Sequence, residues 1–230
     1  MHIPDGYLSP QTYVPLMGVF VVTAAVAVKK VKKEMSIKHI PYLGMAAAFS
    51  FIIMMFNLPV PGGTTGHAVG AAAIAIILGP WSAVLSVSVA LIIQALIFGD
   101  GGITAIGANC FNIGVFMPFV AYYLFKLLRF KSHRPGRIFF ASFTAGYLSL
   151  VLTAILTAAQ FGIQPMIATS PEGIPLYCPY GLNIAVPAMA IEHLLIFGIV
   201  EGLVTAMIVR YFIKNESGLV YVFKKGGKNE

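Results

Sequence analysis

The first two residues, Met1 and His2, form a dipeptide that can chelate a metal ion by itself. A free α-amino group on Met1, the deprotonated amide nitrogen of His2 and the imidazole Nδ1 atom of His2 would close two fused chelate rings. Three nitrogens in one plane leave a position for a fourth ligand, and square-planar nitrogen geometry favours Ni(II) or Cu(II) over Zn or Mg. A histidine in second place also occurs by chance, so the dipeptide alone does not establish a metal site.

This chelate depends on a free N-terminus. Residues 1–11 lack the basic segment of a signal peptide, and no small-residue cleavage site interrupts the first apolar run. We therefore expect Met1 to be the mature first residue once its formyl group is removed, because the bulky His2 disfavours removal of the initiator Met.

His67 is the candidate for the fourth ligand. It lies in the glycine-rich segment PGGTTGHAVG (61–70), where glycines let the backbone approach other groups closely. A neutral imidazole there could reach into a helical bundle, or it could instead bond to a helix end. His39 and His133 lie beside basic clusters, which leaves His2 and His67 as the histidines in Gly/Pro-rich surroundings.

Polar residues within apolar stretches are further candidates. The stretch 94–112 contains Asp100 and Asn109, and polar side chains at membrane depth are costly and often functional. Asp100 could cap the following helix, whereas Asn109 could orient a ligand-bearing loop through hydrogen bonds. Glu192 and His193, in the last apolar segment, could cap, pair or line the same site.

Several functional classes lack support in the sequence. A His-Glu-x-x-His pattern is absent, which argues against a zinc metalloprotease, and without a Walker A motif the chain does not itself hydrolyse ATP. No internal repeat is evident, which disfavours a secondary transporter built from two matching halves. We expect no catalytic residues. Glu201 is expected to face protein neighbours, with a role in ion entry as the alternative.

Composition indicates an all-α integral membrane protein. Of the 230 residues, 58% are hydrophobic and 10% are charged, against about 25% charged in a soluble domain. Seven hydrophobic segments predict a bundle of seven transmembrane helices, approximately at residues 13–28, 40–57, 64–78, 81–98, 105–128, 138–160 and 183–213. The third segment is short and rich in small residues, so we expect it to pack inside the bundle.

Lysine and arginine residues set the predicted orientation. They cluster after the first, fifth and seventh segments, at residues 29–33, 126–137 and 210–214, whereas the intervening loops 58–63, 99–104 and 161–182 have none. The positive-inside rule then places the N-terminus outside and the C-terminus inside. The Met1 end and His67 would share the outer face. The net charge of +7 belongs to the inner loops and does not indicate nucleic-acid binding.

Three motifs in order resemble the NikM/CbiM family, the substrate-binding membrane components of energy-coupling-factor transporters for nickel or cobalt. They are MHIPDGYLS at the start, GGTTGHAVG at 62–70 and QALIFGDGGITAIGAN at 94–109. The resemblance covers residues 1–214, expected to form one seven-helix metal-binding domain, and leaves 215–230 as a polar tail. It implies that the N-terminus enters the bundle. The implied Ni(II) ligands are the Met1 amine, the His2 amide nitrogen and imidazole, and the His67 imidazole.

The resemblance also implies partners in a prokaryotic cytoplasmic membrane: a transmembrane coupling subunit, two ATPase subunits and, as an option, a small accessory membrane protein. Asp100, Asn109, Glu192 and His193 are the residues expected to support the ligands. Co(II) could use the same nitrogens with a weaker preference. Two other classes stay open, namely a freestanding channel or carrier, and an intramembrane enzyme or assembly factor that uses Glu192, His193 or Asp100.

Overall fold

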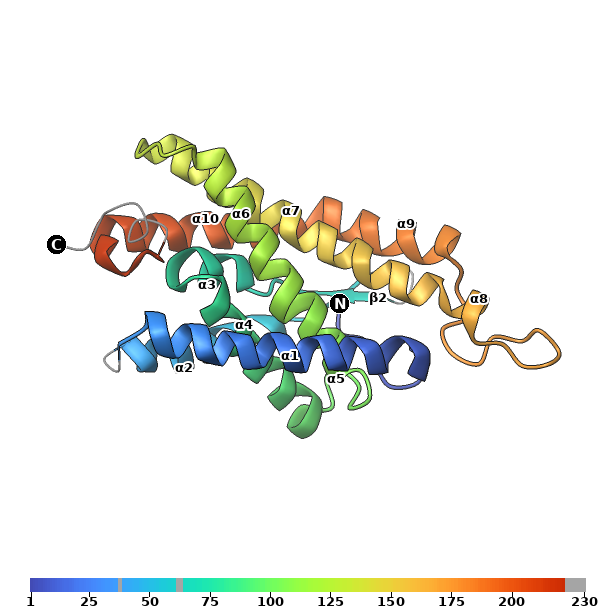
Figure 1. Ribbon diagram of the computed structural model, residues 1–230. Coiled ribbons are helices and arrows are strands. Elements are labelled where there is room, and N and C mark those ends of the chain that lie inside the picture. The colour runs from blue at the N-terminus through green and yellow to red at the C-terminus, as the bar shows by residue number, and fades with distance from the viewer. Residues whose placement is uncertain (37–38, 61–63, 222–230) are drawn as a thin grey trace.

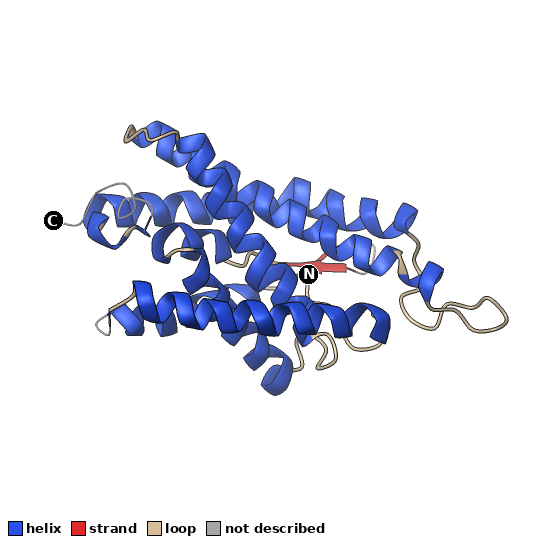
Figure 2. Cartoon of the chain, in the orientation of Figure 1, coloured by secondary structure: helices blue, strands red, loops and turns tan. Residues whose placement is uncertain are grey.

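A computed structural model describes residues 1–36, 39–60 and 64–221 of the chain. Long helices lie along one another and dominate the molecule, with two short strands between them (Figure 1, Figure 2). The elements follow in the order α1 (Pro10–Glu34), α2 (Ile40–Met55), β1 (Leu58–Val60), β2 (Thr64–Gly66), α3 (Ala71–Leu78), α4 (Pro80–Ile93), η2 (Gln94–Phe98), α5 (Ile106–Asn109), η3 (Cys110–Phe116), α6 (Met117–Arg129), α7 (Pro135–Gly162), α8 (Gln164–Ile167), α9 (Leu182–Glu192), η4 (His193–Phe197), α10 (Gly198–Asn215) and η5 (Ser217–Leu219).

Five stretches of helix in the described residues are long and apolar enough to cross a membrane. They are Pro10–Glu34, Pro80–Phe98, Ile106–Arg129, Pro135–Ile167 and Leu182–Asn215. Helix α2 is apolar but has 16 residues, and α3 has eight. The prediction of a multi-pass helical membrane protein is confirmed. Seven helical segments match the seven hydrophobic stretches, but two of them are shorter than expected for a membrane-crossing helix.

The third predicted segment, residues 64–78, is the main departure from the sequence-based expectation. Thr64–Gly66 forms strand β2, which pairs antiparallel with β1, and Gly70 has a left-handed backbone with φ 74°. A helix therefore begins only at Ala71. At about 1.5 Å per residue, its eight residues span about 12 Å of a hydrocarbon core of about 30 Å. Its apolar side chains are nevertheless buried, as expected for a segment inside the bundle.

Three of the long helices contain a π-helical stretch, namely η2, η3 and η4. Each stretch holds a buried polar side chain, Gln94, Asn112 and His193 respectively. A π-helical turn re-aims the side chains that follow it and is often found at functional sites. The π-helical stretch at His193 faces the region described below as the candidate metal centre.

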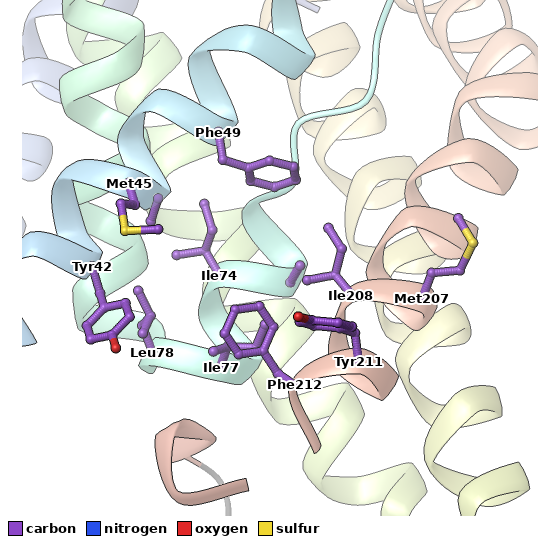
Figure 3. A pocket seen from close by; sticks show the side chains of 12 residues that line it. Tyr42, Met45, Phe49, Ile74, Ile77, Leu78, Met207, Ile208, Tyr211 and Phe212 are labelled. Carbon is purple, nitrogen blue, oxygen red and sulfur yellow. The ribbon is translucent and has the colours of Figure 1, made fainter. Parts of the chain in front are cut away.

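An apolar cavity of about 430 Å³ lies between α2, α3 and α10 (Figure 3). Its lining is hydrocarbon and aromatic, including Phe49, Ile74 and Ile208. The hydroxyls of Tyr42 and Tyr211 are the polar groups on its walls. Such a lining offers no set of ligands for a metal ion, so the cavity is not the candidate functional site.

The two ends of the chain differ in their surroundings. Met1 and Ile3 are 5% and 0% exposed, so the N-terminus lies inside the bundle, where Figure 1 marks it. At the other end, α10 stops at Asn215, and Tyr221 packs its ring against Gly79 and donates its hydroxyl to Glu34 at 2.7 Å. The predicted lysine-rich part of the tail falls in 222–230, outside the described residues.

Candidate metal centre

The N-terminal amine lies at the centre of the candidate site. The Met1 nitrogen donates a hydrogen bond to the main-chain oxygen of Thr65 at 3.2 Å, which joins the start of the chain to strand β2. The His2 main-chain N–H makes no hydrogen bond to any residue that the structure describes. Two main-chain nitrogens are thus available beside the segment that carries His67.

The imidazoles of His2 and His67 meet across this junction. Their ring centroids are 4.8 Å apart and their planes are inclined by 25°. The Nδ1 atom of His67 lies 3.0 Å from the main-chain oxygen of Ala68 and donates to it, so its Nε2 atom carries a lone pair. The Nε2 atoms of both rings are buried and have no hydrogen-bond partner within the described ranges. A buried imidazole nitrogen with a free lone pair can serve as a metal ligand.

The orientation of the His2 ring differs from the one that the chelate requires. His2 Nδ1 lies 3.0 Å from Oδ1 of Asp100, and this contact joins a side chain that is 5% exposed to one that is 28% exposed. The sequence-based hypothesis uses Nδ1 as the metal ligand. Nδ1 is instead held by Asp100, and Nε2 is the ring nitrogen without a hydrogen-bond partner in the described residues.

Asn109 holds the N-terminal segment, residues 1–9, by its main chain. Its Oδ1 atom accepts from the Ile3 N–H at 2.8 Å, and its Nδ2 atom donates to the Ile3 carbonyl at 3.1 Å. The Gly102 N–H donates to the same carbonyl at 2.8 Å. A Cβ atom at Gly102 would lie 2.4 Å from the Asp5 nitrogen, so the close passage of the two backbones requires glycine there.

Two further contacts anchor the N-terminal segment. The Asp5 carboxylate accepts from the N–H groups of Ile103 and Thr104 at 3.1 and 2.9 Å, which binds the segment to the glycine-rich loop before α5. Farther along, Gln164 accepts from the Ser9 N–H at 2.9 Å and donates to the Thr12 hydroxyl at 3.0 Å. The start of the chain is therefore fixed on three sides before α1 begins.

His193 and Glu192 approach the site from η4 and the end of α9. His193 Nδ1 lies 2.8 Å from the Met189 carbonyl and 3.2 Å from Oε1 of Glu192, and its Nε2 atom is buried with no hydrogen-bond partner in the described part of the chain. One turn later, the ring of Phe197 covers Gly66, directly before His67. This packing places His193 beside the His67 segment, as a residue that could support the ligands.

Burial keeps the candidate ligands in their neutral forms. It lowers the pKa of the Met1 amine from 8.0 to about 6, although the carboxylates of Glu192 and Asp100 act in the opposite direction. Burial also lowers the pKa of His67 well below 6.5, and the charge on the Met1 amine adds to this effect. Burial lowers the pKa of His2 too, although the hydrogen bond that its ring donates to Asp100 acts in the opposite direction. These three groups lie outside the helices that are long enough to cross a membrane.

No three His, Cys, Asp or Glu side chains within residues 1–36, 39–60 and 64–221 converge to hold a metal ion. A site built on His2 and His67 therefore needs ligands other than these four side-chain types. The Met1 amine and the His2 amide are the main-chain nitrogens that lie beside the two stacked imidazoles. The donor set would be all nitrogen, which suits Ni(II) or Cu(II) better than a hard cation.

Comparison with known proteins identifies the family of the chain. A family model described as the cobalt uptake substrate-specific transmembrane region, CbiM, matches residues 2–219. The chain belongs to the CbiM family. Membership in the CbiM family confirms the resemblance carried by the three motifs and the multi-pass membrane location. The family is a metal-transport component and not an enzyme.

Individual relatives agree with this CbiM-family assignment. The chain is 46% identical over 213 residues to the probable fused nickel transport protein LarMN of Lactiplantibacillus plantarum, covering 92% of this chain. It is 47% identical over 221 residues to the fused nickel transport protein NikMN of Rhodobacter capsulatus, covering 96% of this chain. The chain spans 64% of the length of each of these relatives. A crystal structure of a transition metal transporter matches with a TM-score of 0.89 and 44% identity, covering 99% of this chain and 100% of that one.

The CbiM-family fold also reveals a contact that the sequence does not indicate. Glu201, from α10, is fully buried, and its carboxylate accepts hydrogen bonds from the N–H groups of Val69 and Gly70. The sequence analysis expected Glu201 to face protein neighbours or to act in ion entry. The contact joins residues 132 positions apart, so no local pattern could have indicated it.

Proposed function

We propose that this chain is the substrate-capture component of a transition-metal importer and binds Ni(II) through four nitrogens. The ligands are the Met1 amine, the His2 amide nitrogen and imidazole, and the His67 imidazole. The observation that carries the proposal is the buried N-terminal amine beside the stacked imidazoles of His2 and His67, since Nε2 of His67 has no hydrogen-bond partner in the described residues. Burial favours the neutral amine and imidazoles, which are the forms that bind a metal.

Metal binding in this form requires the His2 ring to turn. A half-turn about its Cβ–Cγ bond releases Nδ1 from Asp100 and directs it away from the carboxylate. The chelate then closes through the amine, the amide and Nδ1, while Nε2 of His67 supplies the fourth nitrogen. Asp100 thus holds the His2 ring by a charge-assisted hydrogen bond, and the strong amide–metal bond would compensate for its loss.

The transport role rests on family membership and on the printed descriptions of relatives. Relatives that match almost the whole of this chain are described as fused nickel transport proteins. The expected partners are a transmembrane coupling subunit and two ATPase subunits, with a small accessory membrane protein as an option. We propose an outward N-terminus, because the loops near the site carry no Lys or Arg. The ion would then be captured from outside the cell.

Cobalt is the second candidate substrate, since the matching family model is described by cobalt uptake. Co(II) could bind the same nitrogens, but a planar set that includes an amide anion favours Ni(II). Competition between the two ions for the purified protein distinguishes the candidates. Nickel should displace bound cobalt at equal concentration, whereas retention of cobalt would make Co(II) the preferred substrate.

The test is metal analysis of the purified chain with a native N-terminus beside a variant that has one residue added before Met1. The added residue moves the amine away from His67, so we expect nickel to fall from about one ion per chain to a small fraction. His67→Ala should have a similar effect, and His133→Ala, in an exposed basic loop, serves as the matched control. Equal nickel content in the native and extended proteins would refute the proposed ligand set.

A further inference from the structure

Glu201 links the last long helix to the segment that carries His67 through hydrogen bonds. Its Oε2 atom lies 2.7 Å from the Val69 nitrogen and 3.0 Å from the Gly70 nitrogen, and Oε1 lies 3.1 Å from the Gly70 nitrogen. Both oxygens act as acceptors, and the side chain is 0% exposed. A fully buried carboxylate is costly unless such hydrogen bonds stabilise it.

The two N–H groups belong to the residues directly before Ala71, the first residue of α3. Helix α3 begins after Gly70, which has no side chain and a φ of 74°, so the first N–H groups of the helix lack a local side-chain partner. Glu201, from α10, bonds to the N–H groups of Val69 and Gly70 just before the helix, and its negative charge lies at the positive end of the helix. The carboxylate therefore fixes the backbone two and three residues after His67.

The same face of the helix holds the segment on the other side of His67. Phe197 and Glu201 are four residues apart, and a Cβ atom at Gly66 would lie 2.0 Å from the Phe197 ring. The segment 66–70 is thus held by packing at Gly66 and by hydrogen bonds at Val69–Gly70, and His67 lies between these two contacts. The His67 ring is oriented by its hydrogen bond to Ala68, which belongs to this segment, so a shift of the segment moves the ring as well.

We propose that Glu201 is a positioning residue that sets His67 in the plane of the N-terminal chelate. The inference rests on the proposed function and goes beyond it, because Glu201 does not touch the metal and is absent from the ligand set. Replacing the carboxylate by an amide removes its charge and one of its two acceptor oxygens, so the N–H groups of Val69 and Gly70 are bound less well and the segment rearranges. The three N-terminal nitrogens would remain, but the fourth nitrogen would be displaced.

The experiment compares Glu201→Gln with the unchanged protein, both as the full chain with a native N-terminus. Glutamine keeps the size of the side chain but offers one acceptor oxygen in place of two. Residues that orient metal ligands typically change affinity by about 10- to 100-fold, and we expect a nickel affinity lower by this factor. The visible absorption band of square-planar Ni(II) should shift in the direction produced by His67→Ala, because both changes replace the same nitrogen by water.

A double-mutant cycle separates positioning from a general structural effect. If Glu201 acts through His67, adding Glu201→Gln to His67→Ala should leave nickel affinity and spectrum as in His67→Ala alone. Thr205→Val is the matched control, because Thr205 lies one turn beyond on the same helix, is 0% exposed, and has no hydrogen-bond partner for its hydroxyl among the described residues. It should bind nickel as the unchanged protein does.

Copper absorption from the three N-terminal nitrogens reports, in the same samples, whether the chelate is intact. If Glu201→Gln does not yield folded protein, Glu201→Asp replaces it, because its side chain is one methylene shorter. The position of its Ni(II) absorption band is then compared with that of the unchanged protein. An unshifted nickel band and unchanged affinity in a folded Glu201 variant, with a shifted band in His67→Ala, would overturn the inference and leave the proposed function standing. An unshifted band in His67→Ala would instead remove the proposed ligand set.

Discussion

Replacing Gly102 by Ala should displace the nickel-binding end of the chain. A Cβ atom at this position would lie 2.4 Å from the Asp5 nitrogen and 2.7 Å from the Pro4 carbonyl carbon. Both are backbone atoms, so no side-chain rotation relieves the clash. Ordinary van der Waals contact begins at 3.4 Å, and the N-terminal segment must therefore shift by about 1 Å.

The shift is large compared with what a metal site tolerates. Metal–ligand distances vary by about 0.2 Å, so a displacement of about 1 Å beside Ile3 removes the Met1 and His2 nitrogens from the position that His67 completes. A misplacement of about 1 Å lowers the efficiency of preorganised sites about 100-fold, and we expect the nickel dissociation constant to rise by this factor. The overpacked contact should also cost about 1–3 kcal/mol of folding stability.

Calorimetric titration with nickel, together with thermal unfolding of the same samples, measures both effects. Gly18→Ala is the control, because a Cβ atom at Gly18 in α1 meets no atom within 4 Å. In a helix this change should stabilise by about 0.5–1 kcal/mol and leave binding unchanged. A nickel affinity of Gly102→Ala within twofold of the unchanged protein would show that the passage of the N-terminal segment past Gly102 does not position the ligands.

Three other predictions follow from the same geometry. Asn109→Leu removes both hydrogen bonds to Ile3 and should weaken nickel binding by about 10- to 100-fold in the same titration, whereas Asn109→Asp, which keeps an acceptor for the Ile3 N–H, should lose less. Because the Met1 amine has a pKa of about 6, nickel binding should release about one proton, from the His2 amide, at pH 7–8 and about two below pH 6. The slope of log affinity against pH measures this number, and a slope near two already at pH 7 would contradict a lowered amine pKa. Removing nickel with a chelator should lower the melting temperature, since a ligand at 100 times its dissociation constant stabilises by about 2.7 kcal/mol, and an unchanged melting temperature would show that the ion does not bind the folded state at this site.

The sequence predicted the long helices well because apolar length is a local property. It also predicted that Met1, His2 and His67 are candidate ligands, since a dipeptide chelate and a glycine-rich segment can be recognised from adjacent residues. It could not predict where α3 begins. The apolar run that includes Ala71 looks continuous, and the left-handed backbone at Gly70 and the pairing of β2 with β1 delay the start of the helix.

The sequence also could not predict the contacts between segments that lie far apart along the chain. Asp100 was expected as a helix cap or a supporting residue, but its partner proved to be the Nδ1 atom of His2, 98 positions away. Glu201 was assigned no definite partner, and the structure pairs it with the backbone next to His67. Both partners are set by how the helices pack, and neither a composition nor a short motif encodes that packing.

A chelate built on a chain end needs an unusual amount of structural support. Chain termini are normally the least ordered parts of a protein, and fixing the backbone of one residue costs about 1–2 kcal/mol. An N-terminal segment that became ordered only on binding would lose that free energy from its affinity. Here hydrogen bonds from Asn109, Asp5 and Gln164, none of which is a proposed ligand, hold the segment against the bundle. The entropy of ordering the N-terminal segment is therefore lost when the bundle folds and not when the ion binds, and the amine is already held beside His67. On this reasoning, residues without any contact to the ion decide whether a dipeptide that chelates metals weakly in solution becomes a selective site.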